Sequence, residues 1–222
     1  MLRRPGAKLS QLALMPIDSF EHADEDIWIF AYGSLMWRPG FRYEEASHAL
    51  LEGAHRALCL YSVVHRGLPT APGLVFGLDK GGKCEGMAFR VAKQRALDTR
   101  AYLQRRENVT NTYHATMRPV KLLDGSERHV GALCFIVDRR NAQYVGRIPL
   151  EMQAWLVRRS AGKSGANIDY VVNTMLHLRE LGVRDAELER LMSRLGHGLI
   201  KARCLADNGS KAASIAHARE PI

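Results

Sequence analysis

The sequence contains no apolar run long enough to form a transmembrane helix. Its longest apolar segments, residues 27–32 and 132–137, are far shorter than the roughly 18 residues that such a helix needs. Residues 1–16 carry three basic side chains and no acidic one, but they lack the continuous apolar stretch and the cleavage site of a secretory signal. We therefore expect a globular protein of the cytoplasm that has no membrane partner.

Cysteine is scarce and scattered. The four residues are Cys59, Cys84, Cys134 and Cys204, and no two of them form a Cys-x-x-Cys pair. This spacing argues against a disulfide-stapled secreted scaffold and favours free thiols buried in a reducing cytoplasm. The nine histidines form no His-x-x-x-His or His-Glu-x-x-His motif. The sequence therefore indicates no catalytic or structural metal site.

Aromatic residues make up only 7% of the chain, and the basic residues form no continuous run, although the net charge is +9. A strongly basic protein can bind an anionic partner, or it can simply carry a solvated basic surface. The scattered Lys and Arg residues favour the second interpretation, because nucleic-acid sites use basic clusters and stacking aromatic side chains. We expect no nucleic-acid partner.

The pattern of apolar residues and turn residues predicts strands first and helices later. Strands are predicted over residues 27–32, 53–64, 74–78, 86–91, 114–123 and 128–137, and helices over residues 92–107, 150–161, 167–181 and 185–195. Residues 79–82 are expected to form the turn of a hairpin between two of the strands. The order indicates one α+β domain over residues 27–196, with a basic and then acidic arm over 1–26 and a tail over 197–222.

The segment from Trp28 to Trp37 reads Trp-Ile-Phe-Ala-Tyr-Gly-Ser-Leu-Met-Trp, so a predicted buried strand runs directly into Gly33. A glycine at this point allows the backbone to turn sharply and to approach a ligand closely. The N–H groups that follow can bind an anion. The residues alone also fit an ordinary turn between a strand and a loop.

One carboxylate, Glu107, ends a predicted helix and is followed by a polar loop. A carboxylate in a cleft can act as a general base, because burial raises its pKa toward neutrality. The neighbouring Arg105 and Arg106 would lower that pKa. The alternative is a surface glutamate that forms ion pairs with these arginines.

Six short motifs, taken in order along the chain, resemble motifs of the ChaC-type γ-glutamylcyclotransferases. They are Tyr32-Gly33-Ser34-Leu35, His65-Arg66-Gly67 with Pro69 and Pro72-Gly73, Gly86-x-Ala88-Phe89-Arg90, Tyr102-Leu103-x-x-Arg106-Glu107, Asn141-x-x-Tyr144-x-Gly146 and Ser164-Gly165-x-Asn167-x-x-Tyr170. The ordered set is far more specific than any single motif. The segment from Asn108 to Tyr113 differs from the Lys-Gly-Gly-Tyr run of the animal-type members and looks more like the bacterial branch.

The resemblance implies a γ-glutamylcyclotransferase-like fold, a small mixed β-barrel with flanking helices. It also implies a lyase that uses no cofactor or metal and cleaves the small molecule glutathione to 5-oxoproline and Cys-Gly. The α-amine of the γ-glutamyl group would attack its own γ-carbonyl. Two alternatives remain: a cyclotransferase for other γ-glutamyl amines or dipeptides, and a non-catalytic module that binds an anion or RNA on the same fold.

The resemblance also implies roles for particular residues. Glu107 matches the position of the family's catalytic glutamate and would serve as general base and then general acid. The N–H groups from Gly33 to Leu35 would bind the oxyanion or the substrate α-carboxylate. Tyr32 and Tyr144 would shape the γ-glutamyl pocket, and Arg66 would bind a substrate carboxylate.

Overall fold

A computed structural model describes residues 25–107 and 111–196 of the chain. Nearly all of the expected N-terminal arm, residues 1–26, lies outside these described residues, and so does the expected tail, residues 197–222. Cys204 lies in that tail.

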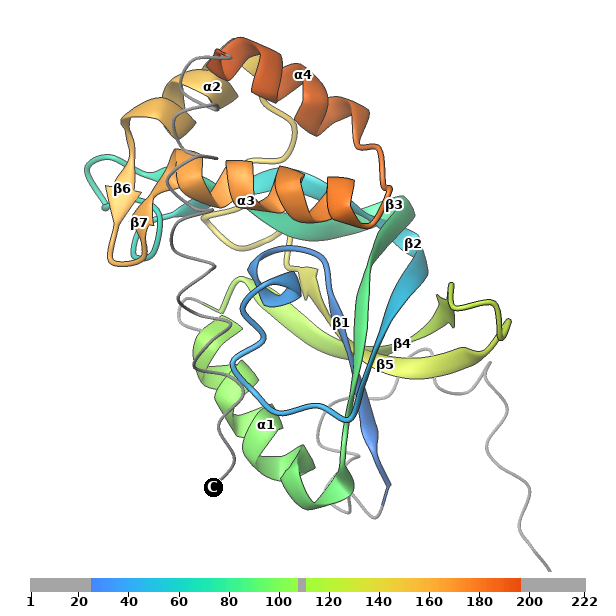
Figure 1. The fold of residues 1–222 in the computed structure, drawn as a ribbon. Coiled ribbons are helices and arrows are strands. Elements are labelled where there is room, and N and C mark those ends of the chain that lie inside the picture. Colours follow the sequence, from blue (N-terminus) through green and yellow to red (C-terminus); the bar gives the residue numbers. More distant parts are fainter. Residues whose placement is uncertain (1–24, 108–110, 197–222) are drawn as a thin grey trace, which may run out of the picture.

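Five strands close into a barrel in the order β1-β3-β2-β4-β5 (Figure 1). The strands are β1 (Ile27–Ala31), β2 (Glu45–Ser62), β3 (Gly73–Val91), β4 (Tyr113–Leu122) and β5 (His129–Val137). β1 pairs in parallel with β5 and closes the barrel, whereas β1–β3, β2–β3, β2–β4 and β4–β5 are antiparallel. The expected mixed β-barrel is confirmed.

The helices are α1 (Lys93–Glu107), α2 (Leu150–Arg159), α3 (Asn167–Glu180) and α4 (Ala186–Leu195), with a short 3-10 helix η3 (Ser34–Met36). A two-stranded hairpin, β6 (Ala161–Gly162) and β7 (Gly165–Ala166), connects α2 to α3. In Figure 1, α2, α3 and α4 gather at one end of the barrel, and α1 lies apart from them. All four predicted helices are confirmed, with ends that shift by at most two residues. None of the described helices is both long and apolar enough to cross a membrane.

The predicted hairpin turn at residues 79–82 is wrong. β3 continues through it as one strand and stays paired with β2 on both sides. Gly81 and Gly82 have positive φ angles of 94° and 72°, and Gly53 on β2 has a φ of 79°. The pairing register shifts between Glu52 and Ala54, so these glycines form a bulge rather than a turn. The first half of β2, from Glu45, lies before the predicted strand 53–64.

The hydrophobic core fills the barrel and continues between the barrel and the helices α2, α3 and α4, which we call the upper helices. In β1, Ile29, Phe30 and Ala31 are fully buried, as expected for a strand with apolar residues on both faces. α3 is apolar on most sides, and it packs against β3, α2 and α4. The barrel and the upper helices therefore share one continuous hydrophobic core.

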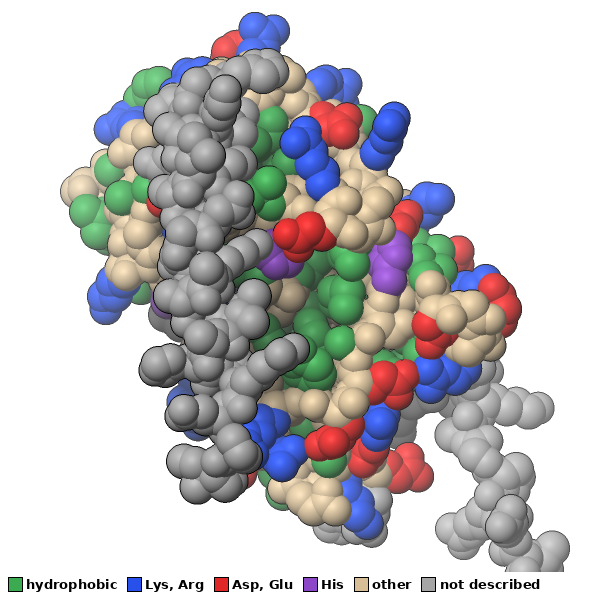
Figure 2. All heavy atoms as spheres, viewed as in Figure 1, with side chains coloured by type: hydrophobic (Ala, Val, Ile, Leu, Met, Phe, Trp, Pro, Cys, Tyr) green, Lys and Arg blue, Asp and Glu red, His purple; other side chains and the backbone are tan. Residues whose placement is uncertain are grey.

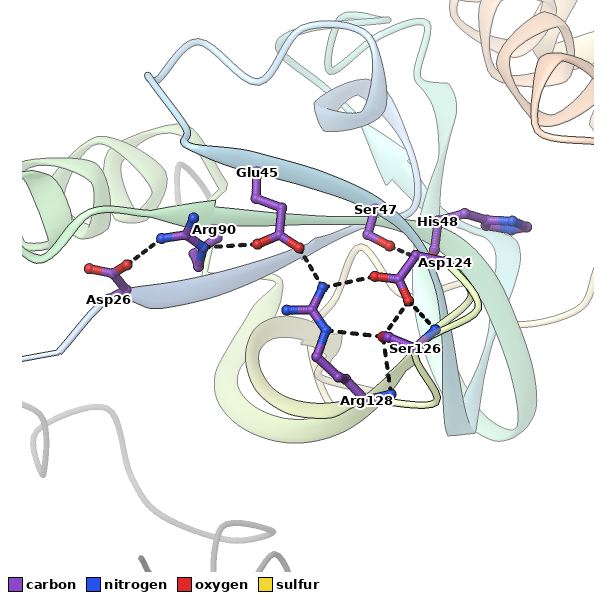
Figure 3. Close-up of polar contacts among 8 residues, drawn as sticks. All are labelled: Asp26, Glu45, Ser47, His48, Arg90, Asp124, Ser126 and Arg128. Atoms are coloured by element: carbon purple, nitrogen blue, oxygen red, sulfur yellow. Dashed lines mark hydrogen bonds and ion pairs between the residues drawn. The ribbon is translucent and has the colours of Figure 1, made fainter.

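A polar network ties together several strands (Figure 3). The guanidinium of Arg90 on β3 pairs with Asp26 at 2.5 Å and with Glu45 at 3.0 Å. Glu45 also accepts from Arg128 at 2.6 Å, and Arg128 pairs with Asp124 in the β4–β5 turn at 2.8 Å. The network therefore joins the start of β1, β2, β3 and the β4–β5 connection.

Candidate functional site

A cavity of about 400 Å³ lies where the loop after β1, the end of α1 and the ends of β2 and β3 meet. This volume falls in the range of small-molecule sites, about 300–1,000 Å³. Six of the seven side chains and glycines that the sequence nominated line it, namely Tyr32, Gly33, Ser34, Leu35, Arg66 and Glu107. The chain thus brings together residues that are up to 75 positions apart in sequence, from Tyr32 to Glu107.

Glu107 is the last residue of α1, and its side chain is only 17% exposed. Burial raises the pKa of this carboxyl, while the neighbouring charge of Arg106 lowers it to a smaller extent. The Nε atom of Arg106 lies 3.4 Å from Oε1 of Glu107. The balance favours a carboxyl that exchanges a proton closer to neutral pH than an exposed glutamate does.

Three of the tyrosines that line the cavity are close enough to Glu107 to feel its charge, namely Tyr32, Tyr113 and Tyr170. Burial is the main cause that raises the pKa of each hydroxyl, and the charge of Glu107 raises it further. These hydroxyls therefore stay protonated and can donate hydrogen bonds at neutral pH. The sequence motifs indicate no role for Tyr113 or Tyr170, although Tyr170 belongs to one of the six motifs.

The loop after β1 approaches α3 closely at Gly33. A Cβ atom at this position would lie 3.1 Å from the hydroxyl oxygen of Tyr170, a tighter distance than side chains ordinarily adopt. η3 begins immediately afterwards, at Ser34. The first N–H groups of a helix have no acceptor within that helix, so this loop offers donors to the cavity that it lines.

Arg106 links α1 to this loop. Its Nη2 atom donates to the hydroxyl of Ser34 at 3.1 Å, and Nη1 donates to the carbonyl of Arg38 at 2.6 Å and to the hydroxyl of Tyr102 at 2.8 Å. Glu107 follows directly in the chain. The contacts of Arg106 therefore set the position of Glu107 relative to the loop. Arg106 belongs to the same sequence motif as Glu107, but the motif alone does not indicate this role.

Arg66 belongs to the connection between β2 and β3 and lines the cavity. The central carbon of its guanidinium lies 5.4 Å from the ring centroid of Tyr170, and Nη1 donates to the carbonyl of Ala166 at 3.2 Å. The loop is compact because a Cβ atom on Gly67 would come within 2.1 Å of the backbone nitrogen of Gly73. This close approach explains why the His-Arg-Gly and Pro-Gly motifs contain glycine.

Tyr144 is the one nominated residue that does not line the cavity. Its hydroxyl donates to Oδ2 of Asp79 at 2.9 Å, and Oδ1 of Asp79 accepts from Nε of Arg139 at 2.6 Å. The neighbouring Gln143 lines the cavity instead. Tyr144 therefore contacts β3 through Asp79 and does not face the cavity.

Within the described ranges, no group of three or more His, Cys, Asp or Glu side chains is placed to hold a metal ion. Cys59, Cys84 and Cys134 are free and buried. On the face drawn in Figure 2, Lys and Arg side chains lie among Asp and Glu side chains rather than in one basic patch. The groups that line the cavity include one carboxylate, three arginines, one histidine, several hydroxyls and main-chain N–H groups.

The sequence matches a family model and the sequences of several characterised proteins. The sequence profile of the family described as "ChaC-like protein" matches residues 27–197. A relative from Escherichia coli, named glutathione-specific gamma-glutamylcyclotransferase, is 34% identical over 166 residues, which cover 75% of this chain and 71% of the relative. A relative of the same name from Schizosaccharomyces pombe is 30% identical over 181 residues, or 73% of this chain and 87% of the relative.

The fold also matches solved structures. The crystal structure of a γ-glutamyl cyclotransferase specific to glutathione from yeast superposes with a TM-score of 0.72. The match covers 78% of this chain and 96% of the yeast chain, at 21% identity. This similarity shows that the two chains share one fold.

Proposed function

The chain belongs to the ChaC-like family, and on that premise we propose that it is a γ-glutamylcyclotransferase that cleaves glutathione to 5-oxoproline and Cys-Gly. One observation carries the proposal: a largely buried carboxyl, that of Glu107, lines the same cavity as the loop from Gly33 to Leu35. The names of the relatives support glutathione as the substrate.

The reaction is an intramolecular ring closure. The α-nitrogen of the γ-glutamyl group forms a bond to the γ-carbonyl carbon, and the bond from that carbon to the cysteinyl nitrogen breaks. A cavity that holds the γ-glutamyl chain folded supplies much of the rate, because the nucleophile and the carbonyl are then already close. No water is consumed, so a partly enclosed site suits the chemistry.

Glu107 moves the proton. In the ionised state its carboxylate takes a proton from the α-ammonium group, which frees the lone pair for attack. The same carboxyl then returns that proton to the cysteinyl nitrogen as it leaves. The extra proton that attack leaves on the ring nitrogen passes to the released amine, so the products are a neutral lactam and an ammonium group. A raised pKa helps both steps, because the carboxyl must first accept and then release one proton near neutral pH.

The loop and Arg66 bind the charges of the substrate. Main-chain N–H groups from Gly33 to Leu35 stabilise the negative oxygen that develops on the γ-carbon. Arg66 binds a substrate carboxylate, for which its paired N–H donors are suited. The three tyrosine rings around Glu107 form the wall against which the γ-glutamyl chain folds.

The cysteines support a reducing compartment for this enzyme. Each thiol that the structure describes is unpaired and buried, which suits a cytoplasmic protein. We therefore keep the cytoplasm as the proposed location.

The decisive test measures 5-oxoproline by mass spectrometry after incubation with reduced glutathione, oxidised glutathione and a panel of γ-glutamyl dipeptides. We expect release from reduced glutathione. We also expect Glu107→Gln to abolish release while the protein stays folded. Release only from other members of the panel would show that the substrate is a γ-glutamyl compound other than reduced glutathione. Substantial activity of Glu107→Gln would overturn the mechanism. No release from any compound by folded protein would overturn the proposed function.

A further inference from the structure

Arg56 on β2 is a buried arginine with a separate partner for each of its three nitrogen atoms. Its side chain is 4% exposed. Nε donates to the carbonyl of Tyr32 at 2.7 Å, Nη2 donates to the carbonyl of Glu85, and Nη1 pairs with Oδ2 of Asp185 at 3.4 Å. A buried charge is costly, so three partners of this kind indicate a position that the fold specifies closely.

The contact with Tyr32 controls the direction of a neighbouring donor. The peptide bond between Tyr32 and Gly33 is trans, and in a trans peptide the carbonyl and the following N–H point in opposite directions. Because Arg56 holds the Tyr32 carbonyl, the N–H of Gly33 points away from Arg56. Gly33 lines the cavity that contains Glu107, whereas Arg56 lines a separate cavity of about 180 Å³.

We infer that Arg56 is a positioning residue that aims the Gly33 N–H at the substrate from behind the loop. The inference rests on the proposed function, which uses that N–H to bind the developing oxyanion. Arg56 never touches substrate. Its positive charge at the carbonyl also polarises the peptide, which makes the N–H on the other side a stronger donor.

Asp185 holds the far end of Arg56. Its Oδ1 atom accepts from the N–H of Leu188 at 3.0 Å, so the same carboxylate caps the N-terminus of α4. Its other oxygen pairs with Arg56. Asp185 and Arg56 therefore connect the N-terminus of α4 to the loop at Gly33.

Four variants test this inference. Arg56→Lys keeps one positive charge but loses the fork of donors, and Arg56→Gln loses the charge. Asp185→Asn keeps a good helix cap and removes the charged partner. Arg118→Gln is the matched control, because Arg118 also donates from a barrel strand to a main-chain carbonyl, that of Glu52 at 3.3 Å.

The readouts are kcat and KM per folded molecule and the amide signal of Gly33 in ¹⁵N-labelled protein. We expect kcat/KM to fall about tenfold to a hundredfold in both Arg56 variants, because small misplacements at a reacting centre are costly. We expect a smaller loss in Asp185→Asn, a shifted Gly33 amide signal in all three, and no change in Arg118→Gln. If Arg56→Gln does not fold, Arg56→Lys and Asp185→Asn carry the test.

Full kcat/KM per folded molecule in Arg56→Lys, with an unchanged Gly33 amide signal, would overturn the inference and leave Arg56 with a purely structural role. The two hypotheses fail separately. Wild-type protein that releases no 5-oxoproline would refute the proposed function, while the Gly33 amide signal would still report whether Arg56 sets that peptide.

Discussion

The side-chain amide of Asn167 makes two hydrogen bonds to the main chain of Leu74. Its oxygen accepts from the N–H and its nitrogen donates to the carbonyl, both at 2.7 Å, and the residue is fully buried. The first residue of α3 thus completes the hydrogen bonding of β3 where the strand begins, as a neighbouring strand would. Three residues later on α3, Tyr170 lines the cavity, and its hydroxyl accepts a hydrogen bond from the N–H of Phe76 at 3.1 Å.

This contact predicts that Asn167→Ala will lower the free energy of unfolding by about 2–6 kcal/mol. The substitution leaves a buried donor and a buried acceptor without partners, and each costs about 1–3 kcal/mol. Urea unfolding followed by circular dichroism measures the loss. Asn173→Ala on the same helix is the control, since it keeps both bonds to Leu74. A loss no greater than that of the control would contradict the prediction.

The pH dependence of catalysis follows from the raised pKa of Glu107. The carboxyl must be ionised to accept a proton, so kcat/KM for glutathione falls as the pH drops through its pKa. Because burial raises this pKa above the ordinary 4.5, the acid midpoint should lie above that value. Initial rates between pH 4 and 8 test this, at pH values where circular dichroism shows folded protein. A midpoint at or below 4.5 would contradict the burial argument.

Arg66→Ala should raise KM for glutathione by roughly tenfold to a hundredfold, since a hydrogen bond to a charged group contributes about 1.5–3 kcal/mol. The side chain lines the cavity and would lose its contact with the substrate carboxylate. Arg95→Ala is the matched control, because Arg95 forms an exposed pair with Glu44 on the surface. Equal KM values for the two variants would remove Arg66 from the binding site.

The network around Glu45 predicts a pH-dependent contribution to stability. Hydrogen bonds from Arg128 and Arg90 lower the pKa of Glu45 in the folded protein. Such a group stabilises the fold above its unfolded pKa, and the contribution is lost as the pH falls through the folded pKa. Glu45→Gln should therefore unfold at lower urea than wild type at pH 7, and the difference should shrink toward pH 3.

Glu151→Gln is the control for Glu45, because its pair with Arg194 is exposed and exposed pairs contribute little. An equal urea difference for Glu45→Gln at pH 7 and pH 3 would show that the ionised network does not stabilise the barrel.

Thiol reactivity follows from burial. Burial raises the pKa of Cys59 to about 12 and also raises the pKa values of Cys84 and Cys134. The thiolate is the reactive form, so these thiols should react slowly in native protein. In a Cys204→Ser variant, a coloured disulfide reagent should label the remaining thiols only after denaturation. Rapid labelling of the native variant would contradict the buried positions.

Sequence patterns predicted elements where one local signal dominated. The helices ended as expected because apolar spacing and turn residues agree there. The turn at residues 79–82 failed because two adjacent glycines also suit a bulge, and only the cross-strand neighbour Gly53 distinguishes the two. That neighbour lies too far away in sequence for local reasoning to find.

The residues of the candidate site were likewise predictable only in part. Motif order located Glu107 and the loop at Gly33 within the chain, and the structure brings both to one cavity. Tyr113 lies on β4, and Arg56 on β2 contacts the loop from the side away from the cavity. Their nearness to the site follows from the closed barrel and could not be predicted from the sequence. Tyr144 shows the converse, since a motif position does not specify which side of a loop a tyrosine will face.

The pairing of β2 with β3 shifts register twice, between Leu58 and Leu60 and at the bulge at Gly53. From there, nine residues lead to Ser62 at the cavity, a span of about 30 Å at roughly 3.3 Å per residue. The shift near Leu60 reverses the one at Gly53, so the pairs from Leu60 to Ser62 have the same register as the pairs before Gly53. Losing one shift without the other would displace β3 by one residue against β2 beside the cavity, which would turn its side chains to the opposite face of the sheet.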